Sequence, residues 1–174
     1  MLDVAVAYNR YKFLGHEFLT WLWFMMDTQP EVLGGLYKDE ITPYMGNRIV
    51  LEAASGDIRE TVTIKGDEAD MQEGRVALKK GALVTELNVI IESGGQQWQF
   101  TIKGESLNIS SLSTPEIGPT SSAEDREGAV LEKAYFYEKL SSYFDSLFQD
   151  FLNQRLAADW ETQRVAAMQN WIRK

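Results

Sequence analysis

The sequence predicts an α+β protein, in which an antiparallel sheet of four to five strands packs against an aromatic N-terminal helix and long C-terminal helices. Apolar residues recur at helical spacing near both ends of the chain and alternate with polar residues through its middle. Short turns, some of them rich in glycine, separate the alternating segments, as in hairpins. The 174 residues fit one domain made of three blocks, 1–30, 36–111 and 121–174.

The first helix is expected over residues 9–27, with Asn9 as its N-cap. Within it, residues 15–24 hold two of the five tryptophans and the only histidine. The apolar side chains cover nearly the whole circumference, which is typical of a helix buried on several sides. We therefore expect this helix to form the centre of the core, and His16 to be a packed or half-exposed residue rather than a catalytic one.

The middle block begins with a predicted hairpin. Residues 47–54 and 58–65 alternate between apolar and polar around a turn at 55–57, which gives the hairpin one buried face. Glu60 is an exception, because it falls on the apolar side of the second strand.

A helix and a second hairpin follow. Residues 68–80 predict a helix that ends at Gly81. Residues 87–91 and 98–102 then pair around a glycine turn at 94–95, and residues 107–109 add a short fifth strand.

The third block follows a linker at 113–119. A capping box is expected to start a long helix that runs to about Leu156, formed either by Ser121 with Glu124 or by Ser122 with Asp125. This helix carries a wide apolar stripe: Val130, Ala134, Tyr137, Phe144, Leu147, Phe148 and Phe151. Asp159 is expected to cap a last helix that carries Trp160, Val165, Met168, Trp171 and Ile172.

Composition limits the cellular setting and the classes of partner. The net charge of −9 disfavours nucleic-acid binding, which normally needs a basic surface to displace counterions. The absence of cysteine excludes disulfides, and we expect a cytoplasmic protein without a signal peptide. The aromatic stretch is too short to span a bilayer, so no membrane association is expected.

The residue types of the chain give little indication of a catalytic site. One histidine and no cysteine leave no basis for a triad or a zinc site, so we expect no enzyme, metal or cofactor. Two acidic clusters lie where helices begin, at 67–70 and 124–127, and the helix dipole accounts for both. A metal-dependent hydrolase that uses Asp67 or Asp70 is the last-ranked alternative.

Basic side chains on the predicted polar sheet face and on the short helix could contact phosphates. A solvated polar face is the simpler interpretation, because Glu52, Glu86 and Glu92 are interspersed. Stacking on single strands is not indicated, since Trp98 and Phe100 fall on the apolar side. The candidate phosphate contacts are Arg48, Arg59, Lys65, Arg75, Lys79 and Lys80.

Several segments resemble the C-terminal part of RdgC-like, recombination-associated proteins. They are residues 14–24 (LGHEFLTWLWF), 124–135 (EDREGAVLEKAY), 147–152 (LFQDFL) and 171–172 (WI). The resemblance implies a non-enzymatic protein that binds duplex DNA with little sequence preference, forms ring-like dimers and restrains recombinase loading.

Two main hypotheses follow. The first is a non-catalytic RdgC-like protein that acts in recombination through double-stranded DNA or a recombination protein. The second is a protein-interaction module, a homodimer or a binder of another partner, whose wide helix stripes exceed what one small domain buries.

Overall fold

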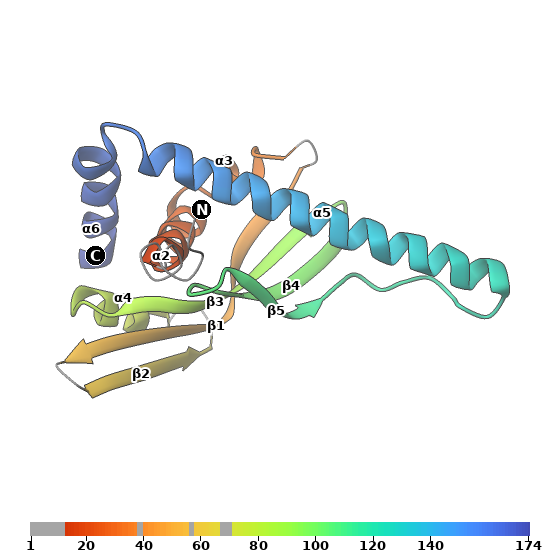
Figure 1. The fold of residues 1–174 in the computed structure, drawn as a ribbon, viewed down its shortest axis with the longest axis horizontal. Coiled ribbons are helices and arrows are strands. Elements are labelled where there is room, and N and C mark those ends of the chain that lie inside the picture. The colour runs from red at the N-terminus through yellow and green to blue at the C-terminus, as the bar shows by residue number, and fades with distance from the viewer. Residues whose placement is uncertain (1–12, 38–39, 56–57, 67–70) are drawn as a thin grey trace, which may run out of the picture.

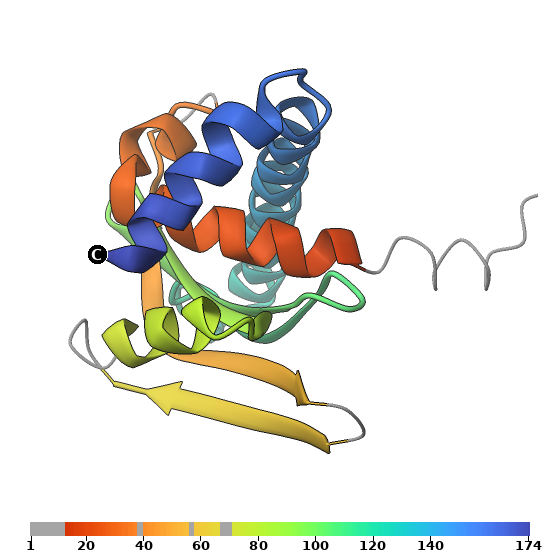
Figure 2. The same cartoon turned by 90° about the vertical axis from the view of Figure 1, so that its left-hand side faces the viewer.

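The protein is described here by a computed structural model that covers residues 13–37, 40–55, 58–66 and 71–174. The described helices lie on one side of a five-stranded sheet (Figures 1 and 2). In chain order the elements are α2 (Phe13–Thr28), α3 (Pro30–Gly34), β1 (Thr42–Ser55), β2 (Ile58–Lys65), α4 (Met71–Lys79), β3 (Leu83–Ser93), β4 (Gln96–Lys103), β5 (Asn108–Ser113), α5 (Ala123–Arg155), the π-helical segment η1 (Trp160–Val165) and α6 (Ala166–Arg173).

The sheet is antiparallel throughout, in the order β2-β1-β3-β4-β5. Its inner face is apolar, because side chains at alternate positions of each strand turn toward the helices. Ile49 pairs with Ile64 on one side and Leu87 on the other, and all three are buried. The outer face is largely polar, and none of the described helices lies on it, which fits an antiparallel sheet with one solvated side.

Helix α2 lies across the inner face of the sheet and is buried around most of its circumference. Phe18, Trp21 and Leu22 have no exposed surface, and Trp23 keeps 2%. Phe18 packs its ring against rings of α5, with centroids 5.2 Å from Phe148 and 5.5 Å from Phe151. The expectation that this helix is the centre of the core is therefore confirmed.

Two glycines let α2 approach the sheet closely. A Cβ built on Gly15 would lie 1.7 Å from the carbonyl oxygen of Gly104, which directly follows β4. No side chain fits at that distance, and the opposing atom is backbone, which cannot rotate away. Beside this contact, His16 Nδ1 donates a hydrogen bond of 2.9 Å to the carbonyl oxygen of Val84. His16 is thus a half-buried packing residue, as its sequence context predicts.

Helix α5 starts at a capping box formed by Ser122 and Asp125. The Asp125 amide donates to Ser122 Oγ, and the Ser122 amide donates to Asp125 Oδ2, both at 2.9 Å. The hydroxyl of Ser121 also donates to that carboxylate, and these bonds hold the pKa of Asp125 below its ordinary value. The second of the two predicted boxes is the one that forms.

The fold class is as predicted, and several element bounds differ. Strand β1 begins at Thr42, before the predicted start, because register shifts between Met45 and Ile49 carry the strand past Gly46. A short additional helix, α3, begins at Pro30, beyond the predicted end of the first helix at residue 27. The predicted N-cap Asn9 lies outside the described residues.

The C-terminal helix differs from expectation in how it begins. Asp159 stands at the N-cap position, but its side chain makes no capping hydrogen bond, so the predicted cap is wrong. The helix opens instead with the π-helical segment η1, which places Trp160 against Phe151 at a centroid distance of 5.9 Å. This tryptophan packs its ring in the core, and the side chain of Asp159 takes no part in capping.

A substitution at Gly15 tests the close approach of α2. We expect Gly15→Ala to lower the free energy of unfolding by about 3 kcal/mol or more, because the added methyl group meets backbone. The control is Gly128→Ala, in an exposed turn of α5 where a Cβ meets nothing within 4 Å. That change should raise stability by up to about 1 kcal/mol. Urea denaturation measures the free energy of unfolding of both variants. Equal changes in the two variants would contradict the close approach of α2 to the sheet as the reason for glycine at position 15.

Candidate functional site

The candidate phosphate contacts are divided between two sides of the β1–β2 hairpin. Arg48 and Lys65 are cross-strand partners on the outer face. Arg59 shares that face, but it lies at the opposite end of β2, about 20 Å away at 3.3 Å per residue. On the inner side, α4 carries Arg75 and Lys79, and the sixth candidate, Lys80, directly follows the helix.

The position of α4 follows from its own glycine. Gly74 packs on the inner side of the hairpin, where its built Cβ lies 3.3 Å from Ile64 Cδ1 and 2.8 Å from the Trp23 ring. Since Lys65 follows Ile64 in the strand, its side chain turns to the opposite, outer face. The structure therefore places three candidates on each side of the hairpin, and on the outer face it brings together only Arg48 and Lys65, with Arg59 apart from them.

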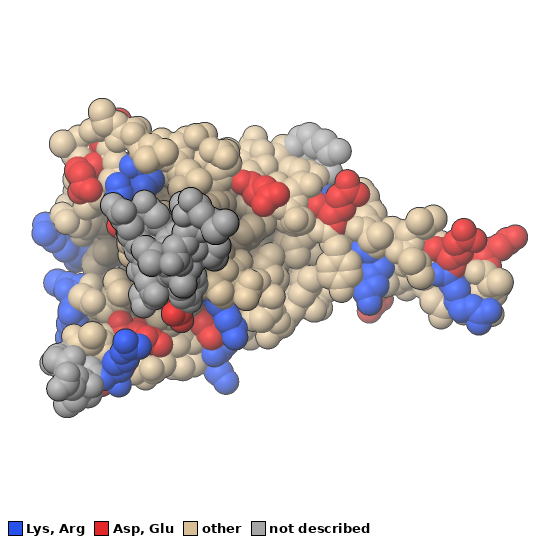
Figure 3. All heavy atoms as spheres, in the orientation of Figure 1, with Lys and Arg blue, Asp and Glu red and all other residues tan. Residues whose placement is uncertain are grey.

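Acidic side chains neutralise part of both groups. On the outer face, Arg48 forms an ion pair with Glu86 at 2.8 Å, and Lys103 is the cross-strand partner of Glu86 on β4. On the inner side, Arg75 lies 3.5 Å from the Asp27 carboxylate. Figure 3 shows acidic and basic groups interspersed over the visible surface. The arrangement offers isolated cations, with no continuous basic groove on that side of the molecule.

Polar networks occupy the rest of the outer face. The buried Asn88 amide donates to the Phe100 carbonyl and to Thr101 Oγ1, and it accepts from Gln99 Nε2 at 2.9 Å. Nearby, the Tyr44 hydroxyl donates to Glu92 at 2.7 Å. Burial, and then the adjacent Glu92 carboxylate, raise the pKa of Tyr44 to about 12. These side chains form hydrogen bonds with one another, so we assign them a role in holding the sheet together rather than in binding a ligand.

The acidic clusters give no metal site in the part of the chain that the structure describes. Asp67, Glu68 and Asp70 lie outside the described residues. Asp125 serves the capping box of α5, and no group of three or more His, Asp or Glu side chains is placed to hold a metal among the described residues. Nor is any helix there both long enough and apolar enough to cross a bilayer.

We define the N-terminal part of α5, residues 123–141, as the arm; its last turns pack on the body through the buried Phe136, Lys139 and Leu140, and its first turns extend beyond the sheet (Figure 1). The segment between β5 and α5 returns along one side of it, where the Gly118 amide contacts Glu132 Oε2 at 3.5 Å. Large apolar side chains stay open on the arm, with exposed fractions of 67% for Val130, 66% for Leu131, 50% for Tyr135 and 46% for Tyr137. The sequence predicts the apolar stripe but not that its first half lies uncovered.

A buried lysine was missed by sequence reasoning. Lys139 keeps only 6% of its surface exposed and donates a hydrogen bond of 2.9 Å to Ser93 Oγ at the β3–β4 turn. Its ammonium group lies 5.5 Å from the centre of the Trp98 ring, within range of a cation–π interaction. Helical spacing from Phe136 and Tyr143 could have indicated it, since Lys139 follows the buried row of α5.

No protein-family model matches the chain, and a comparison with curated proteins likewise finds no match. The RdgC-like interpretation therefore stays a prediction, and function is argued below from the surfaces of the molecule.

The role of Lys139 can be measured as stability. We expect Lys139→Ala to lower the free energy of unfolding by about 2 kcal/mol, through loss of the hydrogen bond, the ring contact and the packed methylene stem. Lys139→Met should recover roughly half, because it keeps the apolar stem. Lys133→Ala, at an exposed position of the same helix, serves as control and should stay within about 0.5 kcal/mol. Equal destabilisation by Ala and Met would show that the stem contributes nothing.

Proposed function

We propose that this protein is a non-catalytic protein-interaction module whose contact surface is the arm of α5. The observation that carries the proposal is the run of open apolar side chains on an element that projects from the body, Val130, Leu131, Tyr135 and Tyr137. Exposed large apolar side chains gathered on one element often mark a protein contact. Aromatic side chains are also the residues most enriched at the centres of such contacts.

The rest of the molecule supports the same proposal. The body buries its large aromatic side chains, including Trp21, Trp98 and Phe100, which have no exposed surface. Its outer sheet face is polar and internally hydrogen bonded. In the described residues, no group of three or more His, Asp or Glu side chains is placed to hold a metal ion. We place the module in the cytoplasm, because a chain without cysteine forms no disulfides and suits a reducing compartment.

A photoreactive residue tests the arm in the producing cell. With p-benzoylphenylalanine at position 137, we expect covalent products larger than the chain, because Tyr137 lies in the proposed contact. The control is the same residue at Leu156, which is 83% exposed but lies at the other end of α5. Analysis by denaturing gel and mass spectrometry identifies what is captured. The photoreactive residue is also placed at position 131, the second exposed site of the arm. If neither position 131 nor position 137 gives a crosslinked product, the proposal is contradicted.

The RdgC-like function in recombination is the second candidate, and the uncovered sheet face is the observation that favours it. Lys65 and Arg59 are exposed there, with no helix above them, and Arg48 pairs with Lys65 across the strands. Such side chains can contact phosphates of a duplex without reading bases. The acidic net charge of −9 works against strong affinity. If the arm binds a recombination protein, the chain can act in recombination even though its acidic net charge disfavours strong DNA binding.

Duplex binding is tested by titration at several salt concentrations. If the outer face binds phosphates, Arg59→Ala with Lys65→Ala should weaken binding and reduce the salt slope by about 0.9 for each phosphate that is no longer neutralised. Lys79→Ala with Lys80→Ala, on the opposite side of the hairpin, is the matched control and should leave affinity unchanged. No affinity for duplex at low salt, or affinity insensitive to salt, would eliminate this candidate.

A further inference from the structure

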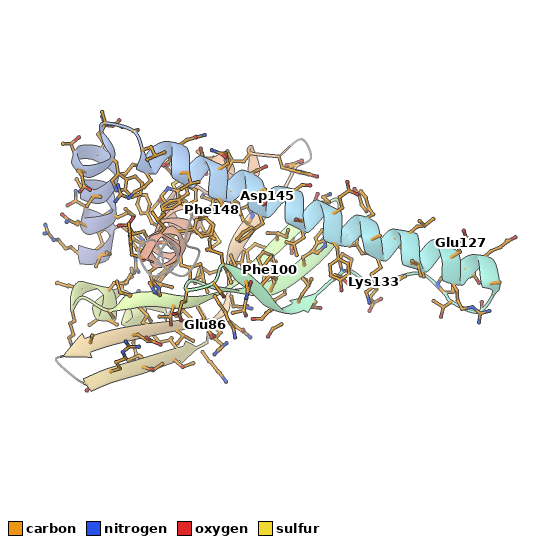
Figure 4. The ribbon with its side chains drawn as sticks, in the orientation of Figure 1. Glu86, Phe100, Glu127, Lys133, Asp145 and Phe148 are labelled. Atoms are coloured by element: carbon orange, nitrogen blue, oxygen red, sulfur yellow. The ribbon has the colours of Figure 1, made fainter. Side chains whose placement is uncertain are left out.

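Exposed acidic side chains line the side of α5 that points away from the body. At 100° per residue, all of them lie within about 40° of Glu138 around the helix. The buried Phe136, Leu140 and Leu147 lie about 160° or more from Glu138, on the opposite side. Figure 4 shows Glu127 and Asp145 on the side of α5 away from the sheet. We call this surface the acidic face and define it by Glu124, Glu127, Glu138 and Asp145.

No basic side chain of α5 lies on the acidic face. Over residues 123–149 the basic side chains are Arg126, Lys133 and Lys139, and each lies about 100° or more from Glu138 around the helix. Among the described residues, none of the four carboxylates of the face forms an ion pair. The face therefore presents uncompensated negative charge to whatever approaches α5 from that side.

Two large apolar side chains are exposed between these carboxylates. Leu131 keeps 66% of its surface exposed and Tyr135 keeps 50%. Both lie within about 60° of Glu138 around the helix. Glu127 precedes Leu131 by about one turn, and Glu138 follows it by about two turns. A partner that covers Leu131 must therefore also approach carboxylates on both sides of it.

We propose that the acidic face binds an amphipathic helix of another protein, one that is rich in lysine and arginine. This inference rests on the proposed function, and it names the chemistry of the partner of the arm. Basic side chains of that helix pair with Glu124, Glu127 and Glu138. An apolar side chain between them packs on Leu131 and Tyr135, and so gives the contact an apolar centre with a charged border.

The spacing of the acidic face fits a helix and not an extended chain. Positions 124, 131, 138 and 145 follow one another at intervals of seven residues. Two helices that pack lengthwise meet again at this interval, so one side of the partner helix contacts all four positions. On α5 the interval is about 10.5 Å. Side chains of an extended segment return to the same side about every 6.6 Å, which does not match it.

The charge of the face disfavours two other occupants. A second copy of this chain, packed through the same face, brings carboxylates opposite carboxylates, and like charges destabilise a helix pair. The phosphate groups of a nucleic acid are repelled by the same carboxylates. The observations therefore favour a cationic protein segment.

Titration of the full chain with a synthetic peptide tests the chemistry of the partner. The probe is a fluorescent helical peptide of about three heptads, with one leucine in each heptad and lysines beside it. We expect binding that weakens as the salt concentration rises, because salt screens the ion pairs. The matched peptide, with glutamate in place of every lysine, should not bind. No binding of the lysine peptide at low salt would overturn the inference.

Charge reversals show whether the peptide binds at the acidic face. Glu127→Lys with Glu138→Lys should weaken binding by at least about tenfold, through loss of attraction at the contact. The control is Glu60→Lys with Glu105→Lys, which makes the same change in net charge at exposed positions outside α5 and should weaken binding less than about twofold. Leu131→Ala should weaken binding about tenfold, since it removes the apolar centre. Circular dichroism checks that each variant is folded. Equal losses in the two double variants overturn the inference, because net charge alone then attracts the peptide.

The natural partner is tested by crosslinking in the producing cell. With p-benzoylphenylalanine at position 131, mass spectrometry should map the captured segment to a helix rich in lysine and arginine. Glu127→Lys with Glu138→Lys should abolish that product, and Glu60→Lys with Glu105→Lys should leave it in place. A product whose yield is the same in both double variants contradicts the inference.

The two proposals fail in different ways. Crosslinks from positions 131 and 137 to a segment without basic residues overturn the basic partner and leave the interaction module standing. The absence of a crosslinked product from both positions contradicts both proposals.

Discussion

The packing of α2 between the inner face of the sheet and α5 is the constraint on which the rest of the structure depends. Phe18 and Trp21 lie fully buried at this contact, with the rings of Phe148 and Phe151 against them. The approach is possible only because Gly15 meets the Gly104 backbone without a side chain between them. The other helices pack on α2: α4 contacts Trp23, α5 contacts Phe18 and α6 contacts Trp23.

The same constraint leaves the arm uncovered. Helix α5 has 33 residues, whereas α2, which packs across it, has 16. The aromatic row of α5 is covered where α2 crosses it, at Phe144 and Phe148, and continues past α2 through Tyr137 and Val130. An apolar row longer than its intramolecular partner is a surface for intermolecular packing, and this links the fold to the proposed function.

Periodicity predicts local features well here, because each depends on neighbours a few residues away. Alternation puts Trp98 and Phe100 on the buried face, and both have no exposed surface. Capping chemistry predicts the Ser122–Asp125 box as one of two alternatives. Asp159 shows the limit: a residue of the right type stands at the helix start, yet its side chain makes no capping bond, and the helix opens as a π-helical segment whose Trp160 packs on Phe151.

The sequence by itself determined the α+β class, the buried central helix and the sheet face taken by the alternating residues of the two predicted hairpins, because these follow from spacing along the chain. Only the tertiary structure decided what lies opposite each surface. Val130 and Phe148 belong to one row with one spacing, yet one is 67% exposed and the other packs on Phe18. Likewise, Arg48 and Arg75 are both basic, but the fold places them on opposite sides of a hairpin, beside Glu86 and Asp27. Spacing defines a face; the length and path of the neighbouring elements determine what covers it.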